Sequence, residues 1–370
     1  MTAAGDRIRV EFDGAAFLQH RRSGISRYFA ELVGVYHGAP ELAVDVSTPY
    51  RYVTNLHVRA ADRTLRTVPL PRRLRTPVLG TLNARARRQA AAADVVHAPL
   101  YDPAVLDRLG GARLVTTVYD FTYEVLPELF GDVEGELHRK RDFLDRADAL
   151  VCISEATADD LRQFHPDLDT PVVVAPLAVS DDFFRPSQQR PRGVPESYLL
   201  HVGNRAAHKN TDLLLRTFAE LAPRRPDLHL VMTGAGMPAE AERLEQLGIA
   251  ERTHLLKVSD ADLPALYRHA AAFVFPSLYE GFGLPVLEAM AAGCPVVVGQ
   301  IPALTEVAGD AAVALPLASP DRLTDIVERI LDDPAYAERL RRAGRERARQ
   351  FTWRRTAELT RGAYDLALCA

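Results

Sequence analysis

Two glutamates, Glu280 and Glu288, flank a glycine-rich loop and have seven residues between them. An apolar run ends just before the loop, and Pro285 stands where its fixed φ would suit the start of a helix. Backbone N–H groups at a helix N-terminus attract anions and hydroxyl-rich groups, and a carboxylate can accept hydrogen bonds from two neighbouring hydroxyls. The segment therefore predicts a ligand site, with Glu288 in the first turn of the helix. The alternative is structural, with Glu280 capping the helix and Glu288 favouring its positive end.

Two cations, Arg205 and Lys209, lie in a second loop between a predicted strand and a predicted helix. Charge-assisted hydrogen bonds are strong, so a pair of fixed cations in such a loop suits a diphosphate. The alternative is a pair of solvent-facing charges without a ligand. The neighbouring His208 is given no role.

The first half of the chain offers further polar residues after its predicted strands. Gly24 precedes a predicted helix and allows a ligand to approach the backbone closely, and Arg27 follows it. Tyr119 and Asp120 follow another apolar run, and Asp13 ends the first predicted strand. A tyrosine donates and accepts hydrogen bonds but is a poor base near neutral pH. Asp120 either orients a ligand or caps the loop that follows.

Short apolar runs alternate with longer helical patterns, and these elements must position the polar residues. Many of the runs are continuously apolar, as in parallel strands that helices cover on both faces. Strand–helix alternation predicts doubly wound α/β sheets, whose ligands bind at the carboxyl ends of the strands. The predicted strands are Ile8–Phe12, Ala43–Ser47, Arg66–Leu70, Val95–Ala98, Leu114–Val118, Leu150–Ile153, Val172–Ala175, Tyr198–Val202, Leu228–Thr233, His254–Lys257, Phe273–Pro276 and Pro295–Val298.

Length and a proline-rich break divide the chain into two predicted domains. Its 370 residues are too many for one ordinary core. Residues 186–196 are polar, rich in proline and without a hydrophobic period, which is typical of a linker. We therefore predict one domain over residues 1–185 and a second over residues 197–350.

The bulk composition narrows the classes of function. The hydrophobic fraction of 47% is that of a globular protein. The net charge of -4 gives no argument for nucleic-acid binding. Three scattered cysteines match neither a zinc site nor a disulfide framework. Neither a signal peptide nor an apolar span of ~20 residues is visible, so we expect a cytoplasmic protein. The stretch from Arg63 to Arg88 has eight arginines and no acid. This stretch is either a solvated face or a basic rim. A basic rim would bind an anionic acceptor, or would attach the protein peripherally to the inner face of a membrane.

The loop between Glu280 and Glu288 resembles the E-x7-E signature of the retaining glycosyltransferases of family four. Gly-Phe-Gly-Leu-Pro lies inside it, and Glu288 opens the sequence Glu-Ala-Met-Ala-Ala-Gly. The resemblance implies that the first glutamate and the following backbone amides meet the donor sugar, and that the second glutamate meets the ribose. The implied donor-site residues are Glu280, Gly281, Phe282, Gly283, Leu284 and Glu288.

The segment His201–Asn210 resembles the family's V-G-x-R-x-x-x-K-N motif, with Gly203 at the glycine position. The resemblance implies that Arg205 and Lys209 hold the diphosphate and stabilise it as it leaves. Val258 lies in a segment that resembles the family's base-binding loop. Such a loop meets the base through backbone groups, so it does not distinguish uracil from guanine.

In the first domain, Gly24 and Arg27 lie in a stretch that resembles the family's G-I-x-R-Y loop, which faces the acceptor and the donor phosphates. Many members have T-x-H-D where this chain has Tyr119 and Asp120, so the resemblance brings no catalytic histidine to this position. Asp120 matches the family's aspartate and is expected to orient the acceptor, and Tyr119 is kept as a donor-site residue. Residues 351–370 resemble the helix that crosses back to the first domain.

Together these matches imply a GT-B fold, in which two Rossmann-like doubly wound domains face each other across a cleft. The implied activity moves a hexose-type sugar, with retention, from a GDP- or UDP-linked donor to a hydroxyl of a polysaccharide, glycolipid or secondary-metabolite acceptor. No D-x-D pair stands at a predicted strand end, so we expect neither an essential metal nor a cofactor. A nucleotide-sugar epimerase, a phosphorylase on the same fold and a non-catalytic nucleotide-sugar-binding protein are left open, as is the oligomeric state.

Overall fold

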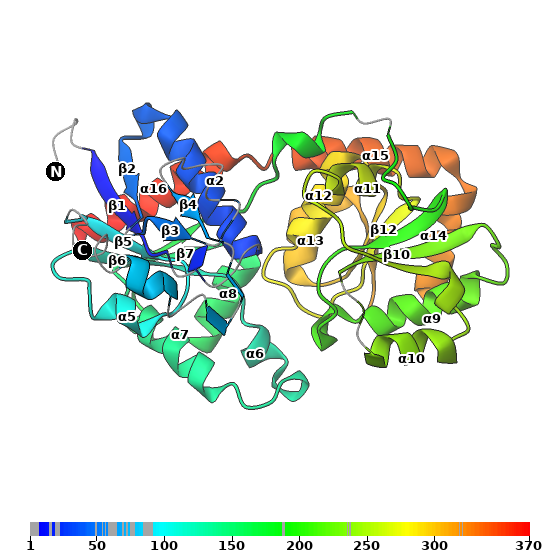
Figure 1. Cartoon of the computed structure of the whole chain (residues 1–370), viewed down its shortest axis with the longest axis horizontal. Coiled ribbons are helices and arrows are strands. Elements are labelled where there is room, and N and C mark those ends of the chain that lie inside the picture. The colour runs from blue at the N-terminus through cyan, green and yellow to red at the C-terminus, as the bar shows by residue number, and fades with distance from the viewer. Residues whose placement is uncertain are drawn as a thin grey trace. The chain divides into compact units, whose positions relative to one another are not determined.

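The computed structural model of the chain describes residues 7–14, 17–18, 23–48, 50–53, 55, 57, 65–68, 70–71, 73–74, 78–83, 92–186, 189–234, 236, 238–317, 319 and 321–370. The chain folds into two compact units (Figure 1). The first unit comprises Met1–Tyr123, Gly131–Leu177 and Trp353–Ala370, and the second comprises Glu124–Phe130 and Ala178–Thr352. The last helix therefore packs with the first unit although it follows the second in the chain.

A parallel sheet forms the centre of the first unit, in the order β2-β1-β5-β6-β7-β8. The last helix of this unit is α16 (Trp353–Cys369), and it packs on α2 (Gly24–Gly38) and on four strands of the sheet. The strands are β1 (Ile8–Phe12), β2 (Val44–Ser47), β5 (Val95–Ala98), β6 (Arg113–Val118), β7 (Ala149–Cys152) and β8 (Val172–Val174), with a separate parallel pair β3 (Tyr52–Val53) and β4 (Arg66–Thr67). Helices of this part of the chain that the structure describes from end to end include α5 (Pro103–Leu106), α6 (Thr122–Val125), α7 (Glu134–Arg146) and α8 (Glu155–Phe164).

The second unit is built around another parallel sheet, in the order β11-β10-β9-β12-β13-β14. Its strands are β9 (Ser197–His201), β10 (Leu228–Thr233), β11 (Thr253–Leu256), β12 (Ala272–Phe275), β13 (Val296–Gly299) and β14 (Val313–Leu315). Its helices are α9 (Thr211–Leu221), α10 (Pro238–Gln246), α11 (Leu263–Arg268), α12 (Leu284–Ala292), α13 (Pro302–Ala308), α14 (Arg322–Asp332) and α15 (Pro334–Ala348). Because the strands are parallel, the loops that leave their carboxyl ends gather at one edge of the sheet.

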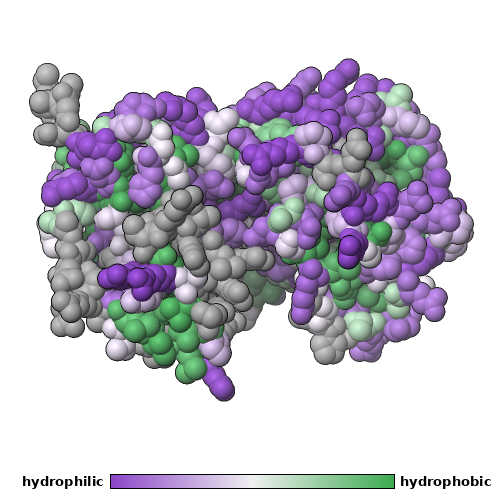
Figure 2. All heavy atoms as spheres, turned by 45° about the horizontal axis from the view of Figure 1, so that its top comes forward, coloured by the Kyte–Doolittle hydropathy of each residue, from purple (hydrophilic) through white to green (hydrophobic). Residues whose placement is uncertain are grey.

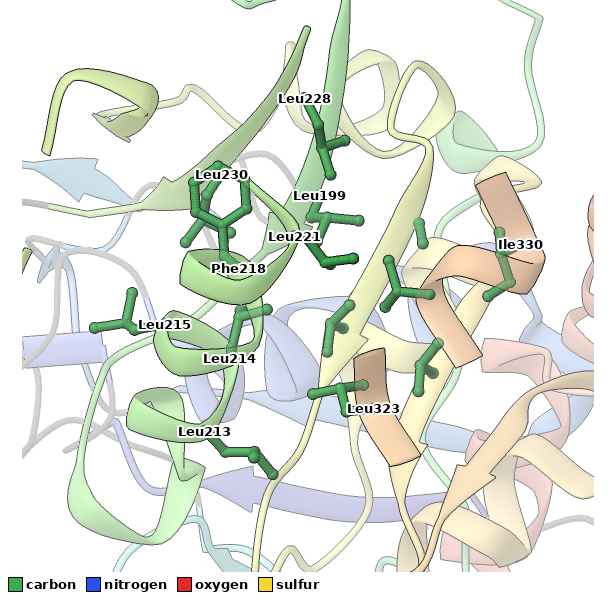
Figure 3. Packing of buried hydrophobic residues seen from close by; sticks show 14 of the residues in the cluster. Leu199, Leu213, Leu214, Leu215, Phe218, Leu221, Leu228, Leu230, Leu323 and Ile330 are labelled. Atoms are coloured by element: carbon green, nitrogen blue, oxygen red, sulfur yellow. The ribbon is translucent and has the colours of Figure 1, made fainter. Parts of the chain in front are cut away.

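Apolar side chains on α9 and on the strands form part of the core of this second unit. Leu214, Phe218 and Leu221 on α9 point toward Leu199 and Leu230 on the strands, as Figure 3 shows. All five side chains are fully buried. Burial of a leucine or phenylalanine side chain contributes roughly 1.5–3 kcal/mol each, so this layer fixes where the ends of β9 and β10 lie. The outer face of the same unit is mainly hydrophilic in the view of Figure 2.

The observed strands match the predicted ones closely, to within a residue or two at most ends. β3 and β14 are additional strands that the sequence pattern did not predict. The arginine-rich stretch from Arg63 to Arg88 lies mostly outside the described residues, so its role stays a prediction. Among the helices that the structure describes, none is long and apolar enough to cross a membrane.

Candidate active site

The glycine-rich loop at the end of β12 leads into α12 through a backbone conformation that only glycine adopts easily. Gly283 is the N-cap of α12 and has a φ of 98°, in the left-handed region. A Cβ at this position would lie 2.4 Å from Cδ2 of Leu304 on α13. Pro285 is the second residue of the helix, where it lacks only a hydrogen bond that the first turn does not make. Positive φ and close packing therefore both require glycine here.

Glu280 and Lys209 meet at the carboxyl edge of the second sheet. Lys209 Nζ donates to Glu280 Oε1 at 2.6 Å, and the Ser277 hydroxyl donates to the same oxygen at 2.7 Å. The Lys209 and Glu280 side chains are 15% and 12% exposed. The backbone N–H of Leu278 donates to the carbonyl of His208, which ties the two loops together. Glu280 therefore does not cap α12; it joins the loop after β12 to the loop after β9.

Glu288 lies just beyond the first turn of α12, the turn in which the sequence analysis placed it. The helix begins at Leu284, so Glu288 is its fifth residue, and the first turn holds no acid. The prediction of a first-turn position was wrong because the loop uses Gly283 as the cap and starts the helix there. Glu288 is 4% exposed, and its Oε2 accepts a hydrogen bond from the hydroxyl of Tyr267 at 3.0 Å.

Arg205 contacts helix α10 and the end of β10. Its Nε lies 2.5 Å from Oε1 of Glu240 on α10, and its Nη1 donates to the Thr233 carbonyl at 2.6 Å. Both charged side chains are 8% exposed. The Gly203 N–H donates to the Thr233 hydroxyl at 3.2 Å, and the φ of Gly203 is 137°. The loop after β9 is thus fastened to the end of β10 by a side chain and by the backbone.

The other predicted donor-site residues lie around this edge. Phe282 is 3% exposed and packs against the Phe351 ring at a centroid distance of 6.0 Å. Gly281 is buried, whereas Leu284 and Val258 are half-buried. Among the predicted donor-site residues that the structure describes, Lys209 and Glu280 are in direct contact with each other.

In the first unit, Gly24 begins α2 and is exposed, with open space where a Cβ would lie. Ser23 caps the helix through a reciprocal pair of hydrogen bonds with Ser26, which leaves the N-terminal turn well defined. Arg27 is half-buried in the first turn of the same helix. The predicted loop is thus a capped helix start.

Tyr119 and Asp120 both make local hydrogen bonds. The Tyr119 hydroxyl donates to the Pro99 carbonyl at 3.0 Å, and Asp120 Oδ1 accepts from the Thr122 N–H at 3.0 Å. Burial raises the pKa of Tyr119 well above its usual value, so the phenol stays protonated at neutral pH. Asp120 therefore caps the loop that follows, and Tyr119 is unsuited to act as a base.

His97 is a buried structural histidine. Its Nδ1 lies 2.9 Å from the Tyr364 hydroxyl, and its Nε2 lies 2.8 Å from the Thr117 hydroxyl. Burial lowers the pKa of His97 from 6.5 to about 3, so the ring is neutral. Asp13 also has a partner within the first unit: its Oδ1 forms an ion pair with Arg108 Nη2 at 2.8 Å. Both residues hold the first unit together at the ends of β1 and β5.

Two family models together match most of the chain: glycosyltransferase family 4 over residues 22–183 and glycosyl transferases group 1 over residues 183–347. O-antigen chain mannosyltransferase B of Escherichia coli is 32% identical over 273 residues, which are 69% of this chain and 70% of that protein. The chain belongs to glycosyltransferase family 4. A D-inositol 3-phosphate glycosyltransferase of Arthrobacter is 29% identical over 349 residues, 88% of this chain and 83% of that protein.

Family 4 membership agrees with the fold. The structure of sucrose-phosphate synthase from Thermosynechococcus elongatus superposes with a TM-score of 0.73 at 22% identity, over 95% of this chain and 96% of that one. The chain therefore has the predicted GT-B fold.

Sequence reasoning did not single out Tyr267 or Glu240. Tyr267 is the fifth residue of the short helix α11, and a single tyrosine there carries little signal. No motif links Glu240 to Arg205.

Proposed function

We propose that this family 4 glycosyltransferase moves a hexose from a nucleotide-diphosphate sugar to a hydroxyl acceptor with retention of anomeric configuration. The observation that carries the proposal is the contact of Lys209 with Glu280 beside the N-terminus of α12. An ammonium group, a carboxylate and a helix N-terminus at one sheet edge supply the partners of a diphosphate and of sugar hydroxyls.

The proposed reaction needs no outside reactant. The bond between sugar C1 and the diphosphate oxygen breaks, and its electron pair stays on the diphosphate. The acceptor oxygen bonds to C1 on the same face, and its proton passes to a leaving phosphate oxygen. Lys209 stabilises the charge that develops on the diphosphate. The protonated phenol of Tyr119 fits this route, because the leaving group serves as the base.

The relatives suggest which donor to test first. Relatives named as mannosyltransferases include the Escherichia coli protein and a protein of Mycolicibacterium hassiacum. We therefore propose GDP-mannose as the first donor and UDP-glucose as the alternative. Among the residues that the structure describes, no group of three His, Cys, Asp or Glu side chains could hold a metal ion, and we propose that turnover needs none.

The test is release of nucleoside diphosphate from each donor, with and without a panel of hydroxylated acceptors, in buffer with EDTA. We expect one donor to react faster with an acceptor, and NMR of the product to show the donor's anomeric configuration. An inverted product would overturn retention. A donor present at ~100 Kd is expected to raise the free energy of unfolding by ~2.7 kcal/mol, which is seen as a rise in the melting temperature. The proposed donor class would be overturned if no GDP- or UDP-sugar raised the melting temperature.

A further inference from the structure

Tyr267 on α11 holds a buried carboxylate of the proposed donor site. Its hydroxyl donates to Glu288 Oε2 at 3.0 Å, and both side chains are buried. Burial of a carboxylate is costly unless the group accepts hydrogen bonds, so this bond bears on where Glu288 points. The helices that carry the two residues, α11 and α12, pack side by side (Figure 1). Contacts that fix the Tyr267 ring therefore also help to place the Glu288 carboxylate.

The Tyr267 ring packs against Phe183, which reaches it from a distant part of the chain. The ring centroids are 6.0 Å apart at an interplanar angle of 54°, and Phe183 is buried. Phe183 ends the 3-10 turn η3 (Asp181–Phe183), and this turn packs on both α11 and α12. Phe273 of β12 meets the same tyrosine edge to face, with centroids 5.3 Å apart. Aromatic pairs at such separations have preferred orientations, so the two phenylalanines restrict rotation of the Tyr267 ring.

Arg268, the next residue of α11, holds the same segment through its backbone. Its Nη2 donates to the carbonyl of Phe183 at 3.0 Å and also to the carbonyl of Arg185. Hydrogen bonds in which the donor is charged are stronger than those between neutral groups. Residues 180–185 are therefore fixed to α11 twice, by an aromatic ring and by two carbonyls, at neighbouring positions of the helix.

We propose that Phe183 and Arg268 are positioning residues of the nucleotide site, which hold the Tyr267 hydroxyl where it donates to Glu288. The inference rests on the proposed function and on the ribose contact that the family resemblance implies for Glu288. A site recognises a ligand group well when its own side chains are locked by packing and by further hydrogen bonds. Residues 180–185, near the start of the long segment Ala178–Thr352 of the second unit, thus take part in recognition of the nucleotide.

The readout is ribose discrimination, measured by calorimetry. It is the dissociation constant of a 2′- or 3′-deoxy nucleoside diphosphate divided by that of the parent GDP or UDP. A general loss of fold stability weakens the binding of both nucleotides alike and leaves this ratio unchanged. We expect Phe183→Leu and Arg268→Met each to lower the ratio by at least ~2-fold, the lower end of the coupling between residues in contact.

Each variant has a matched control in the second unit. Phe184→Leu removes the neighbouring ring, which lies 5.9 Å from the Arg349 guanidinium. Arg252→Met removes another arginine that donates to backbone carbonyls, those of Ala222 at 2.7 Å and Arg225 at 3.1 Å. We expect both controls to keep the ribose discrimination of wild type, whatever they do to stability.

A double-mutant cycle tests whether Phe183 acts through Tyr267. The hydroxyl is absent in Tyr267→Phe, so Phe183→Leu should not lower the ratio further in that background. An equal loss in both backgrounds would overturn the inference, and so would wild-type discrimination in either Phe183→Leu or Arg268→Met. If Phe183→Leu does not fold, Phe183→Met fills the space with a flexible side chain that has no ring, and the same comparison decides.

Failure of the inference is distinguishable from failure of the proposed function. A wild-type chain that binds neither GDP nor UDP would overturn the proposed function. A wild-type chain that binds parent and deoxy nucleotides equally well would keep the proposed donor class but overturn the inference, because Glu288 would then have no ribose contact to be positioned for.

Discussion

At the scale of single residues, Lys209 is unusual because the chain has three lysines among its 45 basic residues. Lys140 is 6% exposed and donates to the Asp120 carbonyl at 2.7 Å, and Lys257 is exposed. With so few lysines, lysine-selective modification of Lys209 can be told apart from that of the exposed Lys257, peptide by peptide. This rarity makes the proposed diphosphate contact directly accessible to experiment.

We predict that the nucleoside diphosphate protects Lys209 from acylation at a ligand concentration that leaves Lys257 reactive, as read by peptide mass spectrometry. Lys209→Gln should lower kcat/KM by ~10²-fold or more, the usual cost of losing one preorganised donor. Lys257→Gln serves as the control and should stay near wild type. Equal modification of Lys209 with and without ligand would contradict the contact.

Tyr267 supports a second prediction, because its hydroxyl donates to Glu288 at 3.0 Å. If Glu288 binds the ribose, wild type should bind a 2′- or 3′-deoxy nucleotide more weakly than the parent nucleotide. Tyr267→Phe should shrink that difference by ~3–10-fold, as for one hydrogen bond to a charged group. Isothermal titration with the two nucleotides measures it.

Tyr198→Phe is the matched control for this prediction. The Tyr198 hydroxyl donates to the carbonyl of Leu266, the neighbour of Tyr267, at 2.6 Å and is also fully buried. Its loss should disturb α11 without changing the discrimination between nucleotides. If both variants shrink the difference equally, Tyr267 acts only through the stability of the helix.

At the scale of elements, the start of α12 depends on Gly283. We predict that Gly283→Ala destabilises the chain by about 1–3 kcal/mol, because it combines a positive φ with the contact to Leu304. It should weaken donor binding at the same time. Gly362→Ala is the control, since its Cβ would meet open space in α16, and alanine is favoured there by about 0.5–1 kcal/mol. Urea unfolding and donor titration check both, and wild-type behaviour of Gly283→Ala would contradict the role of the turn.

The elements themselves were largely predictable from sequence, because buried parallel strands are continuously apolar runs. β9, β10 and β12 were expected close to where they lie, and so was the glycine-rich loop after β12. β14 (Val313–Leu315) escaped prediction because it is short and lies among alanines. The pair of Arg205 with Glu240 also escaped, since an ion pair between distant positions leaves no period or spacing in the sequence.

At the scale of the whole molecule, each unit has a histidine buried in a neutral state. Burial lowers the pKa of His97 to about 3 and that of His201 to about 4. The unfolded chain takes up these protons near pH 6.5, whereas the folded chain does not until the pH reaches the lowered values. The contribution of the two neutral rings to the free energy of unfolding is therefore at its full value above pH 6.5, and it is lost as the pH falls.

We predict a steep acid loss of stability between pH 6.5 and about 4, with each histidine contributing up to ~1.4 kcal/mol per pH unit. His97→Gln should lower stability at pH 7, because it breaks the contact with Tyr364, but should flatten the slope by about that amount. Exposed His37→Gln is the control and should leave the slope unchanged. Urea midpoints at several pH values measure it, and an unchanged slope in His97→Gln would rule out the linkage.

The place of α16 in the first unit also sets the order in which a ribosome can complete the two units. Tyr364 and Ala363 of this helix are fully buried against the first sheet, yet they are synthesised after the whole of the second unit. Domains usually fold in the order in which they emerge. Here the second unit can finish folding while the first still waits, with an open apolar face, for its final helix. We therefore expect chaperones that bind the nascent chain to bind the first unit, which emerges earlier and exposes this apolar face until α16 is made.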